Sequence, residues 1–253
     1  MIHALRSEWI KLRTIRMNWI LVLIGVAFPV IVCVLTAALE KDRDFDAQDL
    51  IDLVQTCSLV TSLLLGVVGA ATITGEFGFG TIRPTFAAMP RRYVVVVAKA
   101  IVTVVVAMAV EAAVVLGTYA VAGAISRSRD RRIVLDDAPN GSAAMLGIVL
   151  LAAIIALLGY GLGLLLRNTP AAVSVLLLWP LLVEPLVGAL LHAVGVEHPF
   201  KWLPYNAGIG IANPEADPDT AEHLARLAGG LYFFGVAAAI ALLGAVLTDR
   251  RDA

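Results

Sequence analysis

The sequence predicts an all-α integral membrane protein with six transmembrane helices and an N-terminal interfacial helix. Hydrophobic residues make up 60% of the 253 residues and charged residues only 15%, whereas soluble domains have about 45–50% and about 25%. The mean hydropathy is +0.88. The apolar residues form runs long enough for helices, which need about 20 residues to cross a bilayer. The alternating segments of about 10 residues that build membrane β-barrels are missing from the sequence.

Residues 1–18 predict an interfacial, or elbow, helix that lies along the membrane. Apolar side chains recur near one helical arc, at Leu5, Trp9, Leu12 and Ile15. Glu8 and Arg16 interrupt this stripe. Trp9 and Trp19 suit headgroup depth. The alternative interpretation is a basic flank that only sets the topology.

Residues 19–253 are predicted to form one transmembrane domain. Its six apolar runs are Trp19–Leu39, Leu50–Thr74, Tyr93–Ile125, Ala143–Leu166, Ala171–Val194 and Leu227–Leu247. The third run would make about 50 Å of helix at about 1.5 Å per residue, so it must tilt or project beyond the bilayer. Pro29, Pro180 and Pro185 predict kinks within spans.

The distribution of Lys and Arg predicts a multi-pass protein of the cell (plasma) membrane with both termini in the cytoplasm. More basic residues precede the first span than follow it, namely Arg6, Lys11, Arg13 and Arg16 against Lys41 and Arg43. The net charge of −1 gives no indication of a nucleic-acid partner. With this orientation, residues 196–226 form an outer loop that we expect to fold back toward the membrane as short helices.

The cytoplasmic loop of residues 75–92 is predicted to contact another protein. Its apolar residues recur at helical steps of three, four and three, at Phe79, Ile82, Phe86 and Met89. This spacing gathers side chains on one face of a short helix. Glycines precede the segment, and Arg91 and Arg92 end it.

Motifs for catalysis and for cofactor binding are missing from the sequence. Nothing matches the Gly-x4-Gly-Lys-Ser/Thr pattern of a phosphate-binding loop. Metal-ligand spacings of His or Cys are missing too, and Cys33 and Cys57 lie in apolar runs as small hydrophobic residues. We therefore expect no catalytic residue, no metal and no cofactor on this chain.

Two acidic residues, Glu111 and Glu184, lie within predicted spans. Burying a carboxylate in a membrane is costly, so each should face the bundle interior, a partner or water. Each could line a translocation path or bind a proton, or it could make an intramembrane polar contact. Lys99 lies near the inner end of the third span and could extend to the surface. Gly159, Gly161 and Gly163 predict close packing between helices of the same chain.

Four stretches resemble the small six-span permeases of ABC-2-type ABC transporters, of the type found in actinobacteria. The stretches are Leu5 to Thr14, Gly75-Glu76-Phe77 through Arg92, Arg167-Asn168-Thr169 with Trp179 to Pro185, and Leu203-Pro204-Tyr205-Asn206. Their order and spacing cover the chain from end to end. One departure is Gly78-Phe79-Gly80, where a more polar pair would be expected before the glycine.

The resemblance implies an ABC-2 (type V exporter-like) permease fold and an exporter function. A second permease copy or a homologue would complete the path, and a separate cytoplasmic ABC ATPase would carry the ATP and Mg. The coupling helix for that ATPase would be the Phe79–Met89 segment. The residues implied in coupling are Glu76, Phe79, Ile82, Arg83, Phe86 and Met89.

Two other functions remain open at this point. One is a proton-coupled secondary transporter that uses Glu111 and Glu184. The other is a membrane anchor subunit that transports nothing. The sequence does not indicate the transported substrate, since its apolar spans do not distinguish between drugs, lipids, peptides and polysaccharides.

Overall fold

The computed structural model describes residues 2–14, 16–39, 46–82, 92–128, 133–138, 140–213 and 223–251. These residues form helices and connecting turns, without a β-strand among them. The α-helices are α1 (Ile2–Thr14), α2 (Arg16–Leu39), α3 (Ala47–Gly78), α5 (Arg92–Arg127), α6 (Gly141–Leu166), α7 (Thr169–Leu178), α8 (Glu184–Ala193), α9 (Pro204–Ile209) and α10 (Arg226–Arg251). Shorter turns are η1 (Leu135–Asp137), η2 (Trp179–Val183), η3 (Pro199–Trp202) and η4 (Gly210–Ala212).

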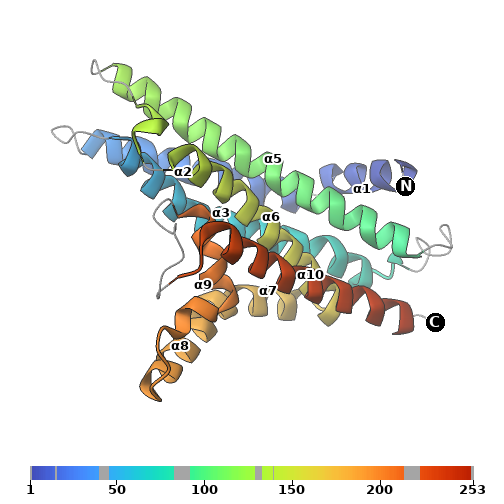
Figure 1. Cartoon of the computed structure of the whole chain (residues 1–253). Helices are drawn as coiled ribbons and strands as arrows, with labels where there is room; N and C mark the ends of the chain where they lie inside the picture. The colour runs from blue at the N-terminus through green and yellow to red at the C-terminus, as the bar shows by residue number, and fades with distance from the viewer. Residues whose placement is uncertain are drawn as a thin grey trace.

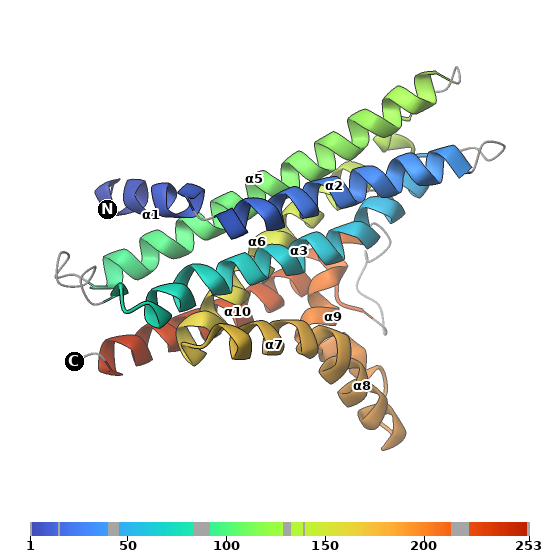
Figure 2. The same ribbon diagram turned by 180° about the vertical axis from the view of Figure 1, so that it is seen from behind.

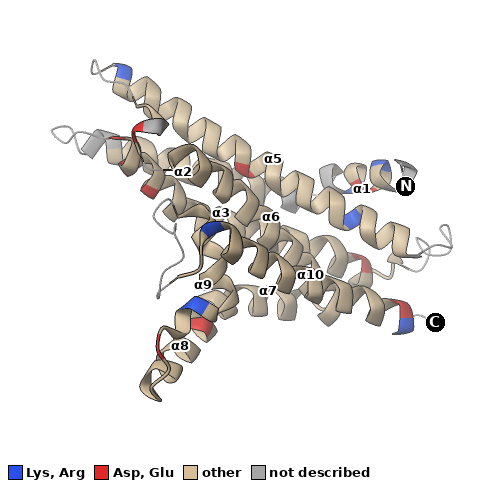
Figure 3. Ribbon diagram, viewed as in Figure 1, with Lys and Arg blue, Asp and Glu red and all other residues tan. Residues whose placement is uncertain are grey.

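Six helical segments among the described residues are long and apolar enough to cross a membrane. They are α2, α3, α5, α6, the continuous run from α7 through η2 to α8, and α10. Each coincides with one predicted span, which confirms the all-α, six-span fold class. Helix α5 has 36 residues, or about 54 Å at about 1.5 Å per residue. Among the described residues, most charged ones lie near helix ends (Figure 3).

Helices α3 and α6 form the centre of the bundle, and both are mostly buried. Glycines let their backbones approach closely. A Cβ atom at Gly69 would lie 2.5 Å from the Ala156 carbonyl oxygen, and one at Gly159 would overlap the backbone of Gly66. Gly161 and Gly163 likewise face residues of α10 and α3. The small residues of α6 therefore serve packing within the chain, as predicted.

Both chain termini lie at one end of the bundle, which we call the N/C end (Figure 1). Helix α1 lies there beside the first turns of α5, and the last turn of α3 ends close by (Figures 1 and 2). On either side of residues 83–91, the described chain continues from the end of α3 at Gly78 to Ile82 and resumes at Arg92, the first residue of α5. A separate helix is thus present within residues 1–18, and its position along a membrane surface stays a prediction.

The fifth span bends where α7 meets α8 (Figure 2). The five residues Trp179–Val183 form a π-helical turn that contains Pro180. Proline cannot donate a backbone hydrogen bond, and a π turn accommodates one extra residue in the helix. Pro185 lies in the first turn of α8. Pro29 lies inside α2 without ending the helix.

The described part of residues 196–226 contains the short elements η3, α9 and η4. Helix α9 packs on α10, and η4 packs on both α6 and α10. Short helices are therefore present in this segment and pack on the bundle, whereas its location outside the cell stays a prediction. Figure 1 shows α9 between α8 and the rest of the molecule.

Candidate functional site

Four charged side chains meet at the N/C end. The Lys11 ammonium on α1 lies 3.0 Å from Glu8 Oε1 and 2.7 Å from Glu76 Oε1 on α3. The Lys99 ammonium on α5 lies 3.1 Å from Glu76 Oε1 and also pairs with Glu8 Oε2. We call these four residues the ion cluster. It joins α1 to the ends of α3 and α5.

The ion cluster is balanced in charge and largely excluded from solvent. Glu8, Glu76 and Lys99 are buried, whereas Lys11 is partly exposed. Burial alone would lower the pKa of Lys11, but its hydrogen bonds to Glu76 and Glu8 outweigh this and raise the pKa above its usual value. Removing one member of such a buried group leaves a charge without compensation, which is strongly destabilising. The cluster therefore holds α1 in one position.

The structure places Glu76 in this cluster and not on an exposed surface. Its Oε1 atom accepts from both lysines, whereas Oε2 is buried without a partner among the described residues. A pocket of about 320 Å³ lies beside it, lined in part by Phe79 and Thr81. One carboxylate oxygen thus remains available to a donor that enters this pocket.

Phe79 and Ile82 do not share one exposed face, contrary to the prediction from their spacing. Phe79 ends α3 and is 87% exposed. Ile82 is only 6% exposed and packs in a cluster with Val95, Val96 and Tyr160. The physical reason is the left-handed backbone of Gly80 (φ 69°), which redirects the chain between them. Arg83, Phe86 and Met89 lie outside the described residues.

Lys99 is buried, so the expectation that it extends to the membrane surface is wrong. Only 3% of the residue is exposed. The carboxylates of Glu8 and Glu76 supply the charge compensation that solvent would otherwise provide. Glu8, which interrupts the apolar stripe of α1, is the residue that fixes this helix to the bundle.

Further contacts tie the helices together at the N/C end. The Tyr160 hydroxyl of α6 donates to the Val96 carbonyl of α5 at 2.8 Å. Thr169 of α7 donates to the Thr74 hydroxyl of α3 at 2.7 Å. Arg167, at the end of α6, lies 4.6 Å from the centre of the Phe77 ring and donates to the Thr248 carbonyl of α10. The helix ends are thus cross-linked by polar contacts.

Glu111 lies in the seam between α3 and α5 and is fully buried. The Thr61 hydroxyl lies 2.9 Å from both of its carboxyl oxygens. Ser58 and Thr61 share the face of α3 that meets it, since residues three apart on a helix are neighbours. The observed contact is an intramembrane polar contact. A role in a translocation path or in proton binding stays a prediction.

Glu184 is only 1% exposed and holds the start of α9 in place. Its Oε1 atom accepts from the Trp179 indole at 2.9 Å and from the Tyr205 backbone N–H at 2.8 Å. Its Oε2 atom accepts from the Asn206 backbone N–H at 2.9 Å. A carboxylate is favourable at a helix N-terminus, where backbone N–H groups lack partners within the helix. Glu184 therefore caps α9 from another helix.

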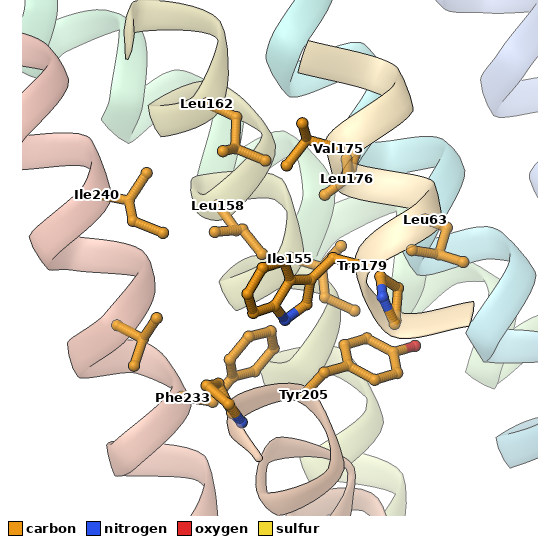
Figure 4. Close-up of a pocket in the computed structure, with 13 residues that line it drawn as sticks. Leu63, Ile155, Leu158, Leu162, Val175, Leu176, Trp179, Tyr205, Phe233 and Ile240 are labelled. Carbon is orange, nitrogen blue, oxygen red and sulfur yellow. The ribbon is translucent and has the colours of Figure 1, made fainter. Parts of the chain in front are cut away.

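An apolar cavity of about 160 Å³ lies beside Glu184, between α7 and α10. Figure 4 shows its walls: Ile155, Leu158 and Leu162 of α6 face Val175 and Leu176 of α7, and Trp179 and Tyr205 lie near the middle. Sequence reasoning did not find this cavity. Pro180 predicted the bend in the fifth span, but the cavity depends on how α6, α7 and α10 diverge from one another.

Comparison with known proteins identifies the family. A family model described as ABC-2 family transporter protein matches residues 4–178. The match begins in α1, includes all four members of the ion cluster and ends in α7. Among curated proteins, no sequence matches this chain. Because the matched region covers more than half of the chain and the fold has six spanning helices, the protein is a multi-pass membrane permease of the ABC-2 transporter family.

Proposed function

We propose that the chain is the membrane-spanning permease subunit of an ABC exporter. It would form the translocation path together with a second copy or a homologue. A separate cytoplasmic ABC ATPase would bind ATP and Mg and supply the energy. In this proposal the complex lies in the plasma membrane, and the N/C end of the chain faces the cytoplasm.

The ion cluster is the observation that carries the proposal. Glu76 lies in the last turn of α3, which is also the first part of the 75–92 segment. Through Lys11 and Lys99 it joins that turn to α1 and α5. A displacement of the loop by a bound protein would therefore move three helices together.

The remaining contacts at the N/C end extend the same connection to α6, α7 and α10. The side chain of Arg167 contacts both Phe77 of α3 and Thr248 of α10. Movement that begins at the loop would thus tilt the helix ends as one unit. An ATPase that tilts the transmembrane helices from outside the membrane requires helix ends that move together in this way.

Phe79 supplies a surface for the partner. A large aromatic side chain that is 87% exposed beside a pocket of about 320 Å³ is typical of a contact residue in a protein interface. The unpartnered Oε2 atom of Glu76 could accept from an Arg or Lys of the ATPase in the same pocket. Phe86 and Met89 are proposed to extend this contact.

Co-purification tests the proposal. The chain is expressed together with a candidate partner ABC ATPase, and the recovered ATPase is quantified for Phe79→Asp, Phe86→Asp and Met89→Asp. We expect each variant to lose most of the ATPase, since a buried unpaired charge opposes an apolar contact. The matched control is Val134→Asp, an exposed apolar residue in the loop that follows α5. Retention of the ATPase by all three variants would overturn the coupling role of the loop.

Transport is tested with the assembled complex. Substitution of the phosphate-binding Lys of the ATPase should stop export, and dissipating the proton gradient should not. The reverse result would favour the proton-coupled alternative.

A further inference from the structure

We propose that a cavity between η3, α9 and the start of α10 binds the headgroup of a phospholipid that carries a phosphate and a primary ammonium group, as phosphatidylethanolamine does. The cavity has a volume of about 760 Å³, and sites for small molecules have about 300–1,000 Å³. This inference does not depend on the ATPase. It rests on the position of the cavity, on the accessible side chains that line it and on the charge of the surrounding segment.

The cavity lies where the last two candidate spans end, on the side of the bundle away from the N/C end. His192, in the last turn of α8, lines one wall, and the fifth candidate span ends at Ala193. His223 and Leu224 line another wall, directly before the sixth candidate span begins at Arg226. Helix α10 runs from there to the C-terminus at the N/C end (Figure 1). Because both spans end beside the cavity, its depth is that of lipid headgroups.

Exposed apolar side chains near the cavity supply a surface for acyl chains. Leu190, Val194 and Trp202 are all more than half exposed. Tryptophan is enriched at the boundary between the hydrocarbon and the headgroups of a bilayer. The Tyr232 hydroxyl of α10 donates to the Trp202 carbonyl at 3.0 Å, which holds η3 at the level where α10 begins. A ligand without acyl chains would leave these apolar side chains unused, so a lipid is the complementary occupant.

The lining offers accessible donors that match a phosphate group. The imidazoles of His192 and His198 and the carboxamide of Asn206 line the cavity, and all three residues are exposed. Lys201 of η3 adds a positive charge to the same lining. Hydrogen bonds between charged donors and a phosphate are among the strongest in proteins. Among the described residues, no group of three His, Cys, Asp or Glu side chains is arranged to hold a metal ion, so a phosphate suits these imidazoles better than a metal does.

The charge of the segment selects a zwitterionic headgroup with a primary amine. Residues 196–226 contain five acidic residues and two basic ones, which opposes a lipid of net negative charge. One of these acids, Glu197, lines the cavity, and a carboxylate accepts from an ammonium group with its three N–H donors. A choline group has no N–H and is bound by several aromatic rings. Phe200 is the one Phe, Tyr or Trp side chain in the described lining, so ethanolamine fits better than choline.

Native mass spectrometry of the full chain in detergent tests the proposal. The chain is titrated with phosphatidylethanolamine, phosphatidylcholine and phosphatidylglycerol that carry the same acyl chains. We expect phosphatidylethanolamine to bind several-fold more tightly than the other two lipids. Soluble phosphoethanolamine, added at the same concentrations, should not displace it. Equal binding of the three lipids would overturn the headgroup assignment. Displacement by phosphoethanolamine would show that the site takes a soluble phosphorylated amine and would overturn the lipid as its ligand.

Variants separate the ammonium side of the site from the phosphate side. Glu197→Gln should reduce the binding of phosphatidylethanolamine to the level of phosphatidylcholine. Lys201→Gln should weaken both lipids alike, because both carry the phosphate. Neither residue is buried, so both variants should keep the melting temperature of the parent protein. The matched control is Arg127→Gln, which removes an exposed positive charge at the far end of α5, outside this cavity. An unchanged preference in Glu197→Gln, or an equal loss in Arg127→Gln, would refute the site.

Discussion

Glu8 on α1 forms an ion pair with Lys99 on α5, although 91 positions separate them in the sequence. Together with the Lys11–Glu76 pair, it fastens α1 to the bundle. It also places two charges inside the bundle, which is tolerated only because each has an opposite charge in contact. The position of α1 therefore depends on a few named side chains.

Glu8→Gln should loosen α1 from the bundle. The variant leaves the Lys99 ammonium with Glu76 as its remaining carboxylate partner, and we expect a loss of roughly 1–3 kcal/mol in the free energy of unfolding. Limited proteolysis of residues 1–18 should become faster. Arg6→Gln, an exposed change on the same helix, is the matched control. Adding Lys99→Met to Glu8→Gln should recover part of the loss, because it removes the excess positive charge and leaves Lys11 paired with Glu76. A double variant less stable than Glu8→Gln would contradict this interpretation.

Thr61 and Glu111 should be energetically coupled. A double-mutant cycle with Thr61→Val and Glu111→Leu removes each partner singly and together. We expect an interaction free energy of about 0.5–3 kcal/mol, as for residues in direct contact. Unfolding is followed by titration with a denaturing detergent. Strictly additive effects would show that the 2.9 Å contacts contribute nothing to stability.

Glu184→Gln should destabilise the segment that contains α9 more than Glu111→Gln destabilises the α3–α5 seam. Glu184 accepts three N–H donors, and an amide nitrogen cannot accept any of them. Charged hydrogen bonds contribute about 1.5–3 kcal/mol each, so the loss should be at least about 2 kcal/mol. Hydrogen exchange at the Tyr205 and Asn206 amides measures it directly. Equal protection in both variants would argue against the capping role.

Gly159→Ala should disrupt the contact between α3 and α6, because the new methyl group would overlap the backbone of Gly66. We expect a loss of several kcal/mol in the free energy of unfolding, or failure to fold. The control is Gly235→Ala in α10, where no atom lies within 4 Å of the added carbon. That variant should be neutral or up to about 1 kcal/mol more stable, because alanine favours helix. Similar melting temperatures for the two variants would exclude the close approach.

The spans were predictable because a bilayer imposes a length and a composition on each one. That is why the bounds of Tyr93–Ile125 and Ala143–Leu166 come close to those of α5 and α6. The same rule says nothing about which neighbour a buried polar group meets. Lys99 was expected at the surface because its partners, Glu8 and Glu76, come from distant parts of the chain.

Helical spacing shows which residues share a face, but it assumes one continuous helix. The turn at Gly80 breaks that assumption, and Ile82 consequently packs inside while Phe79 stays exposed. The kink at Pro180 was predictable from the missing N–H of proline. The cavity beside it was not, because it depends on the directions of α6, α7 and α10 together.

The π-helical turn at Trp179–Val183 also sets the rotational phase of α8. One residue corresponds to about 100° of rotation in an α-helix with 3.6 residues per turn. Deleting a single residue from this turn would rotate α8 about its axis. Glu184 would then face away from the N-terminus of α9, and the other α8 side chains would face different neighbours. The contact between Glu184 and α9 therefore requires this turn to keep its length of five residues. Within the fifth span, spacing matters more than the identity of any one apolar side chain.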